Sequence, residues 1–126
     1  MSPTEFMRTY ETVTNTHDLD ALLELIADDA IYLFSNQTSH FGKNAIRSAI
    51  QANFDAIEDE AYRIQHLKWL ASSEDVAACV YEFEWSGKVN GKPASGHGRG
   101  TTVIRRAGDE WKVAHEHLSS GRLMGP

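Results

Sequence analysis

The feature that most constrains the fold is a change in the spacing of apolar residues shortly before residue 60. Up to that point they recur every three or four positions, as on one face of a helix; beyond it they recur every second position, as on one face of a strand. Turn-forming segments interrupt the second part at residues 72–75, 90–91 and 107–109. The pattern predicts an α+β domain in which helices lie on one face of a sheet.

Two helices are expected at the start of the chain. Residues 2–5, Ser-Pro-Thr-Glu, have the pattern of a capping box, and the apolar stripe that follows ends near residue 15. Asp18 is suited to cap a short second helix, whose leucines continue the three-and-four spacing as far as Ile26.

A strand, a further helix and a series of long strands complete the prediction. Residues 30–34 are apolar and too few for a helix, so they indicate a strand, and a polar loop follows at residues 35–40. A third helical stripe runs from Asn44 to Ile57. The expected remaining strands are 62–71, 76–89, 97–106 and 110–119. Gly98 and Gly100 at the start of the third of them, with Gly96 just before it, are expected to permit bending of the sheet.

Composition narrows the class of protein. The chain of 126 residues is long enough for one domain, 1–126, with its own core, and 41% hydrophobic residues indicate an ordinary globular protein. A net charge of −6 argues against nucleic acid as a partner, and no apolar run reaches the length of a membrane span. A single cysteine, Cys79, with no leader-like start, predicts a cytoplasmic protein.

Several short motifs resemble one family. They include Ala27-Asp28-Asp29-Ala30, Gly42-x-x-Ala45-Ile46-Arg47 and His115-x-His117-x-Ser119. In combination they resemble the nuclear transport factor 2-like superfamily, in particular its SnoaL-like branch, which is related to ketosteroid isomerase and to the association domain of calcium/calmodulin-dependent protein kinase II. The resemblance implies a cone-shaped, curved antiparallel sheet wrapped around three N-terminal helices, an apolar pocket for a small molecule, and a homodimer formed through the outer face of the sheet.

Alternation along residues 76–89 selects candidate pocket residues. Tyr81, Phe83 and Trp85 share one face, which we expect to point inward, although such a row is more often plain core than a surface for a ligand. The complete predicted ligand pocket comprises Tyr32, Phe34, Tyr81, Phe83, Trp85, Thr102 and Leu118.

The orientation of the last strand is open. The apolar start of the strand favours an inward face with Trp111, Val113, His115 and His117. The resemblance favours the other face, with Glu116 and Leu118 inward, and we prefer it. Arg99, His115 and His117 then form the alternative, outer face.

His115-x-His117 also has the spacing of two metal ligands on a strand. The only further imidazole expected near that face is His97, and no carboxylate pattern would orient the rings. We therefore predict neither a metal nor another cofactor.

The resemblance to the isomerase carries over only in part. Tyr10 occupies the position of the oxyanion-binding tyrosine, but Phe34 stands at the position of the proton-transferring carboxylate and Thr101 or Thr102 at that of the second acid. A phenyl ring cannot accept a proton, so the classical dyad is absent. Tyr10 and Glu116 remain the candidate catalytic residues, because an inward Glu116 would have a raised pKa.

Two functions follow. One is an isomerase, cyclase or dehydratase acting on a small apolar carbonyl compound. The other is a non-catalytic ligand-binding or oligomerisation module.

Overall fold

The computed structural model describes residues 1–123, which form a mixture of helices and strands. Its six strands form a single sheet in the order β2-β1-β6-β5-β4-β3. The elements are α1 Pro3–Thr16, α2 Leu19–Leu23, β1 Ile26–Leu33, β2 Ser39–Phe41, α3 Lys43–Ala56, β3 Glu58–Ser72, β4 Val76–Val89, β5 Lys92–Ala107 and β6 Glu110–Ser119. The predicted class, helices on one side of a strongly curved sheet, is confirmed.

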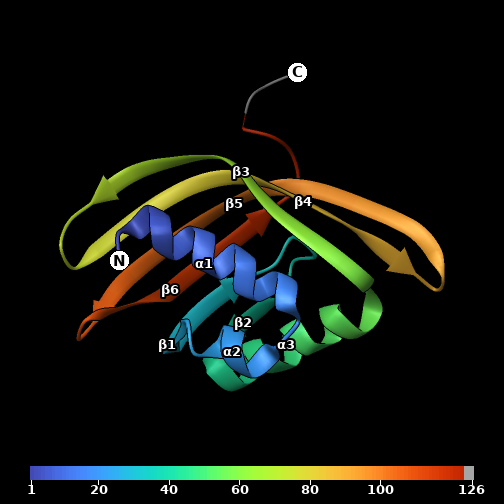
Figure 1. The fold of residues 1–126 in the computed structure, drawn as a ribbon, viewed down its shortest axis with the longest axis horizontal. Helices are drawn as coiled ribbons and strands as arrows, with labels where there is room; N and C mark the ends of the chain where they lie inside the picture. Colours follow the sequence, from blue (N-terminus) through green and yellow to red (C-terminus); the bar gives the residue numbers. More distant parts are fainter. Residues whose placement is uncertain (124–126) are drawn as a thin grey trace.

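The sheet curves over α1, while α2 and α3 lie together at the end formed by β1 and β2 (Figure 1). It is not antiparallel throughout, as the resemblance implied. β1 runs parallel to β6, with Ile31 opposite His115 and Leu33 opposite His117. The parallel pairing is possible because α3 and the four strands β2 to β5 separate β1 from β6 in the chain, which supplies the long crossover that parallel neighbours need.

The first helix forms as its cap predicts. The Ser2 hydroxyl accepts a hydrogen bond from the Glu5 amide at 3.1 Å, and the helix ends at His17, which takes a left-handed φ of 60°. Phe6, Met7 and Tyr10 from its apolar stripe are buried against the sheet. Burial of this stripe, rather than intrinsic helix propensity, holds α1 in place.

The second helix is shorter than predicted. It ends at Leu23, and Ile26 begins β1 instead of continuing the helix. The amide of Val113 donates a hydrogen bond to the Leu25 carbonyl at 2.8 Å, so pairing with β6 takes over where the helix stops. Ile26 is fully buried at the start of β1, and the expected helical stripe also required a buried residue there, so its apolar character did not distinguish the two conformations.

Other boundaries also differ from the sequence prediction. The expected loop at 35–40 contains the start of the short strand β2, which pairs with β1. β3 begins at Glu58 rather than 62, and β5 begins at Lys92 rather than 97. Glu58, Asp59 and Glu60 are all acidic, and residues 92–96 contain no branched or aromatic apolar residue, so apolar alternation did not mark either extension.

The three alternate glycines of β5 make room for the aromatic row of β4. Tyr81, Phe83 and Trp85 lie directly opposite Gly100, Gly98 and Gly96 in the register. A Cβ at Gly98 would lie 2.5 Å from the carbonyl oxygen of Ser119 and 2.6 Å from the Phe83 ring. Each ring therefore covers a glycine backbone across the strand pair.

We expect Gly98→Ala to destabilise the protein by about 1–3 kcal/mol, because one of its clashes is with backbone that cannot rotate away. Gly96→Ala is the matched control, since its close contacts are all with the partly exposed Trp85 ring, which can move. Urea denaturation of both variants measures the difference. Equal losses of stability in the two variants would contradict this interpretation.

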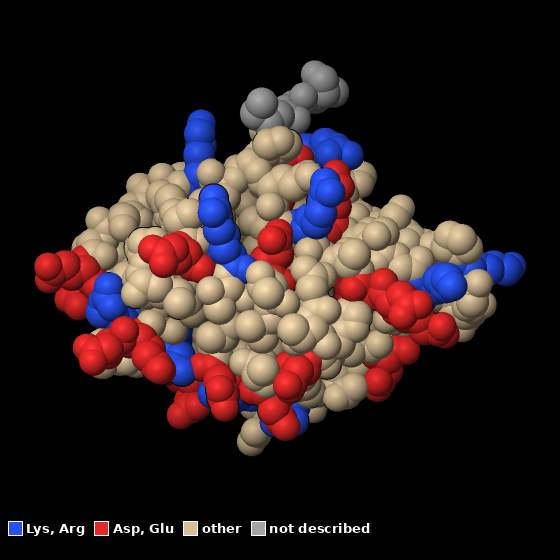
Figure 2. All heavy atoms as spheres, in the orientation of Figure 1, with Lys and Arg blue, Asp and Glu red and all other residues tan. Residues whose placement is uncertain are grey.

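Acidic side chains gather along the lower rim of the molecule in Figure 2, over the helices and strand ends, and the basic side chains are scattered among them or project from the upper edge. This face therefore carries no continuous basic surface. Among residues 1–123, no helix is long and apolar enough to cross a membrane.

Candidate functional site

A bulge in β6 determines which side chains enter the interior. Val113 pairs with Ile104, but His115 pairs with the preceding residue Val103, so Ala114 has no partner on β5. Trp111 and Val113 before the bulge are buried in the core. The extra residue reverses the alternation, and Glu116 after it is also buried. The predicted orientation with Trp111 and Val113 inward thus holds before the bulge, and the one with Glu116 inward holds after it.

The interior contains a buried hydrogen-bonded cluster of two phenols and a carboxyl group. The Tyr10 hydroxyl donates to Glu116 Oε1 at 3.1 Å, and its oxygen lies 2.9 Å from the Tyr32 hydroxyl. Tyr32 and Glu116 are neighbours on β1 and β6, whereas Tyr10 reaches them from α1. Three separate elements therefore assemble this cluster, which we call the Tyr10–Tyr32–Glu116 cluster.

Burial governs the protonation of this cluster. Loss of solvent raises the pKa of Glu116 to about 7, and the hydrogen bond from Tyr10 opposes that rise. Burial, together with the nearby Glu116 charge, raises the pKa of Tyr10 and Tyr32 well above the ordinary phenol value. Near neutral pH the phenols are therefore donors, and Glu116 can accept or release a proton.

The cluster faces a small cavity of about 90 Å³. The residues that line it are Tyr10, Thr14, Leu22, Tyr32, Phe34, Ile50, Asn53, Phe54, Glu60, Tyr62, Glu116 and Leu118. Phe34 and Leu118 also line a larger depression of about 380 Å³ that reaches the surface beside His117 and the loop before β2. Phe34 and Leu118 thus border both spaces.

Five predicted residues line this cavity, namely Tyr10, Tyr32, Phe34, Glu116 and Leu118. Four others do not. Tyr81 and Thr102 are fully buried and bonded to each other through their hydroxyl groups at 2.8 Å, and Phe83 packs over Gly98. Trp85 lines a separate depression with Arg63, His97 and Arg122. Tyr81 and Phe83 are buried in the core, because the glycines opposite them leave room for their rings.

The residues of the alternative face lie on the outer side of the sheet. Arg99 donates from Nε to the Ser119 hydroxyl at 3.1 Å, and His115 Nδ1 lies 2.8 Å from the Ile31 carbonyl oxygen. Neither histidine lines the cavity, and the two rings are 6.2 Å apart. Within residues 1–123, no group of three or more His, Cys, Asp or Glu side chains is arranged to hold a metal ion.

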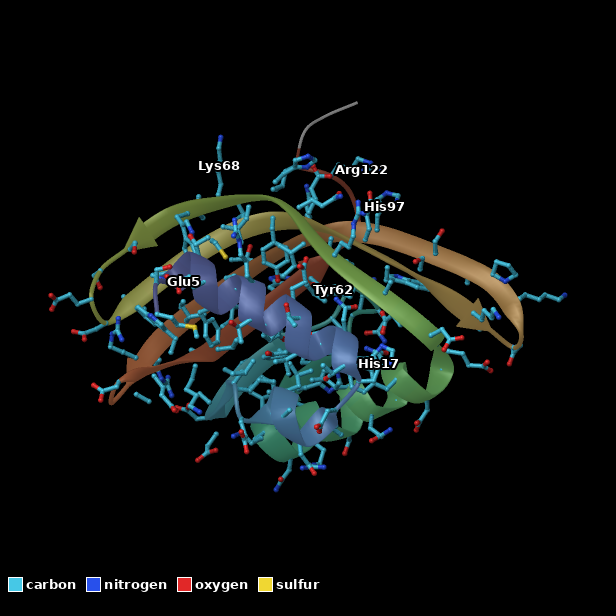
Figure 3. All side chains as sticks on the ribbon, in the orientation of Figure 1. Glu5, His17, Tyr62, Lys68, His97 and Arg122 are labelled. Carbon is cyan, nitrogen blue, oxygen red and sulfur yellow. The ribbon has the colours of Figure 1, made fainter. Side chains whose placement is uncertain are left out.

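Sequence analysis missed a second wall of the cavity, which comes from β3 and α3. Tyr62 and Glu60 alternate onto the inner face of β3, and Asn53 and Phe54 reach the cavity from the end of α3. Figure 3 shows His17 and Tyr62 on the inner side of β3, near the end of α1. The alternation of Tyr62 with Ile64 could have indicated the first of these residues; nothing in the spacing indicated Glu60, which precedes the predicted start of the strand.

Solved structures with a similar fold carry various descriptions. A candidate aromatic ring hydroxylase from Novosphingobium aromaticivorans superposes with a TM-score of 0.83 at 22% identity, covering 96% of this chain and 86% of that one. A candidate scytalone dehydratase from the same species superposes with a TM-score of 0.80 at 13% sequence identity, and the match covers 91% of this chain and 78% of that one. A ketosteroid isomerase-like protein from Erwinia carotovora superposes with a TM-score of 0.78 at 19% sequence identity, and the match covers 92% of this chain and 91% of that one. At these identities the likeness concerns the fold alone.

Sequence comparison gives the family. No curated protein sequence matches the chain. The profile of the SnoaL-like domain matches residues 4–122, nearly the whole chain, and one similar solved structure is described as an NTF2-like protein with a cystatin-like fold. The protein belongs to the SnoaL-like domain family.

Proposed function

We propose that the protein is a cofactor-independent acid–base enzyme that moves a proton at the carbon next to the carbonyl group of a small, largely apolar compound, as an isomerase, cyclase or dehydratase would. The observation that carries the proposal is the buried carboxyl group of Glu116, which faces the cavity and is hydrogen-bonded to Tyr10. Similar folds described as ketosteroid isomerase-like and as a candidate scytalone dehydratase support the same class of chemistry.

The roles follow from the protonation states. Tyr10 and Tyr32 remain protonated near neutral pH. When a ligand enters, their hydroxyl groups turn from Glu116 and from each other to donate hydrogen bonds to the carbonyl oxygen, which gains negative charge as the neighbouring C–H bond breaks. Glu116, with a pKa of about 7, takes that proton as a carboxylate and returns it to another carbon or to solvent. A base whose pKa lies near the working pH is effective in both directions.

Phe34 and the cavity size limit the substrate. The inner cavity of about 90 Å³ is smaller than the roughly 150 Å³ cavity that accommodates benzene. A fused ring system does not fit inside it, and Phe34 cannot serve as the base that the isomerase carries at this position. The reactive part of the substrate is therefore a small ketone or aldehyde, and classical steroid isomerisation is excluded from the proposal.

Exchange of α-protons in D₂O tests the proposal without knowledge of the natural substrate. The protein is mixed with acetone or with butan-2-one, and proton NMR follows loss of the α-proton signal. The proposal expects exchange well above the rate in buffer alone. Binding of the ketones without any accelerated exchange would overturn it and would favour the non-catalytic module.

We place this chemistry in the cytoplasm, where a free cysteine such as Cys79 is expected.

We further propose that the protein is a homodimer joined through the outer face of the sheet. The helices cover only the inner face, and the outer positions Ile31, Val80 and Val103 are apolar and only half-buried in the single chain. Light scattering at micromolar concentration should return twice the chain mass of 14.1 kDa. A mass of one chain would contradict the proposal.

A further inference from the structure

A second carboxyl group, that of Glu60, lines the same cavity and has no part in the Tyr10–Tyr32–Glu116 cluster. It comes from β3, which β5 and β4 separate from β6 in the sheet. Glu60 and Glu116 therefore stand on opposite walls, brought to one cavity by the curvature of the sheet. The cavity has an acid–base group at each side and apolar residues between them, including Leu22, Ile50 and Phe54.

The position of Glu60 is fixed by contacts with α1. Asn15 makes two hydrogen bonds to the backbone of Tyr62, receiving one from its amide at 2.7 Å and donating one to its carbonyl at 2.8 Å. The ring nitrogen Nε2 of His17 lies 2.9 Å from the Glu60 carbonyl oxygen. These contacts hold both ends of the Glu60–Tyr62 segment against the helix, so that alternate side chains are held toward the cavity.

The surroundings of the Glu60 carboxyl group are partly dry and nearly uncharged. Burial raises its pKa, and His17 opposes that effect. Among the side chains that line the same cavity, Thr14, Asn53 and Tyr62 are neutral polar groups. A partly desolvated carboxylate at the edge of an apolar cavity is a strong acceptor for one hydrogen-bond donor of a ligand.

We propose that Glu60 binds the hydroxyl group of a small hydroxy-carbonyl compound whose carbonyl oxygen lies at the Tyr10–Tyr32–Glu116 cluster. The substrate class is then a short β-hydroxy ketone or aldehyde rather than a purely apolar ketone. The placement of the carbonyl group rests on the proposed function, whereas the recognition of the hydroxyl group rests on the position of Glu60 alone. Glu60 is in this sense a specificity-determining residue.

An isosteric pair of ligands isolates this contact. 4-Hydroxybutan-2-one and pentan-2-one have the same number of non-hydrogen atoms and differ by a hydroxyl in place of a methyl group. NMR titration of the protein amide signals measures the affinity for each. Since a hydrogen bond to a charged group contributes on the order of tenfold or more, we expect the wild type to prefer the hydroxy ketone by about tenfold.

Three variants complete the experiment. Glu60→Leu should abolish the preference, Glu60→Gln should retain part of it because its amide oxygen still accepts, and the control Glu58→Gln, two residues earlier on β3 and exposed, should keep it in full. A preference retained in Glu60→Leu, or no preference or no binding in the wild type, would overturn the inference. Exchange of α-protons is measured separately, so a failure of the proposed function would leave the preference intact and would be recognised as such.

Discussion

Replacing Glu116 with Gln should reduce α-proton exchange of small ketones by about 10² to 10⁴-fold, because the glutamine amide keeps the shape of the side chain but cannot accept the proton. The loss should appear in the exchange rate at saturating ketone, since binding depends mainly on Tyr10, Tyr32 and the apolar lining. The measurement is the NMR exchange rate in D₂O, with folding checked by circular dichroism.

Glu84→Gln is the matched control, because Glu84 lies on the outer face of the sheet, beside Arg63 at 3.9 Å, and does not line the cavity. Its exchange rate should equal that of the wild type. Tyr10→Phe gives an independent readout. The hydrogen bond from Tyr10 lowers the pKa of Glu116, so its removal should move the midpoint of the pH–rate profile upward from about 7. An unchanged rate in Glu116→Gln would exclude this residue as the base.

The same residue should make the stability of the protein depend on pH. The pKa of Glu116 rises from its ordinary value of 4.5 to about 7 on folding, so between these values the folded state binds more protons than the unfolded state. The contribution of Glu116 to the stability of the folded state is therefore fully present below pH 4.5 and is lost as the pH rises through 7. The shift corresponds to about 3 kcal/mol in the free energy of unfolding.

Urea denaturation of the wild type and of Glu116→Gln at pH 5 and pH 8 measures this effect. Glutamine does not ionise, so the variant should gain about 2–3 kcal/mol relative to the wild type between the two pH values. Any constant cost of the substitution, such as a weaker bond to Tyr10, cancels in that comparison. The same difference between the two proteins at both pH values would show that the carboxyl group is not held in a dry site.

Much of the candidate site could be predicted because two of its members lie in regular elements. Tyr10 belongs to the apolar stripe of α1, and Tyr32 lies in the compact apolar run that forms β1. Helix stripes and strand alternation are local properties, so the face of each side chain can be predicted before its partners are known. The aromatic row of β4 was assigned to the correct side of the sheet in the same way, but not to the cavity.

The orientation of Glu116 could not be settled from alternation, since the bulge at Ala114 reverses it within β6. A bulge arises from the pairing of two strands and leaves no clear mark in the spacing of one of them. Glu60 escaped prediction for a related reason, because the part of β3 before residue 62 forms through contacts with β4 and with Asn15, not through apolar spacing of its own.

The sequence by itself determined the elements whose causes are local: the capped helix α1, the turns between the long strands, and the α+β class that follows from the change of period. Only the tertiary structure decided which groups share the cavity. Tyr10 and Glu116 are 106 positions apart, and Glu60 reaches the same space from the far edge of the sheet. Their meeting depends on sheet curvature, register and one bulge, and these are properties of several strands packed together.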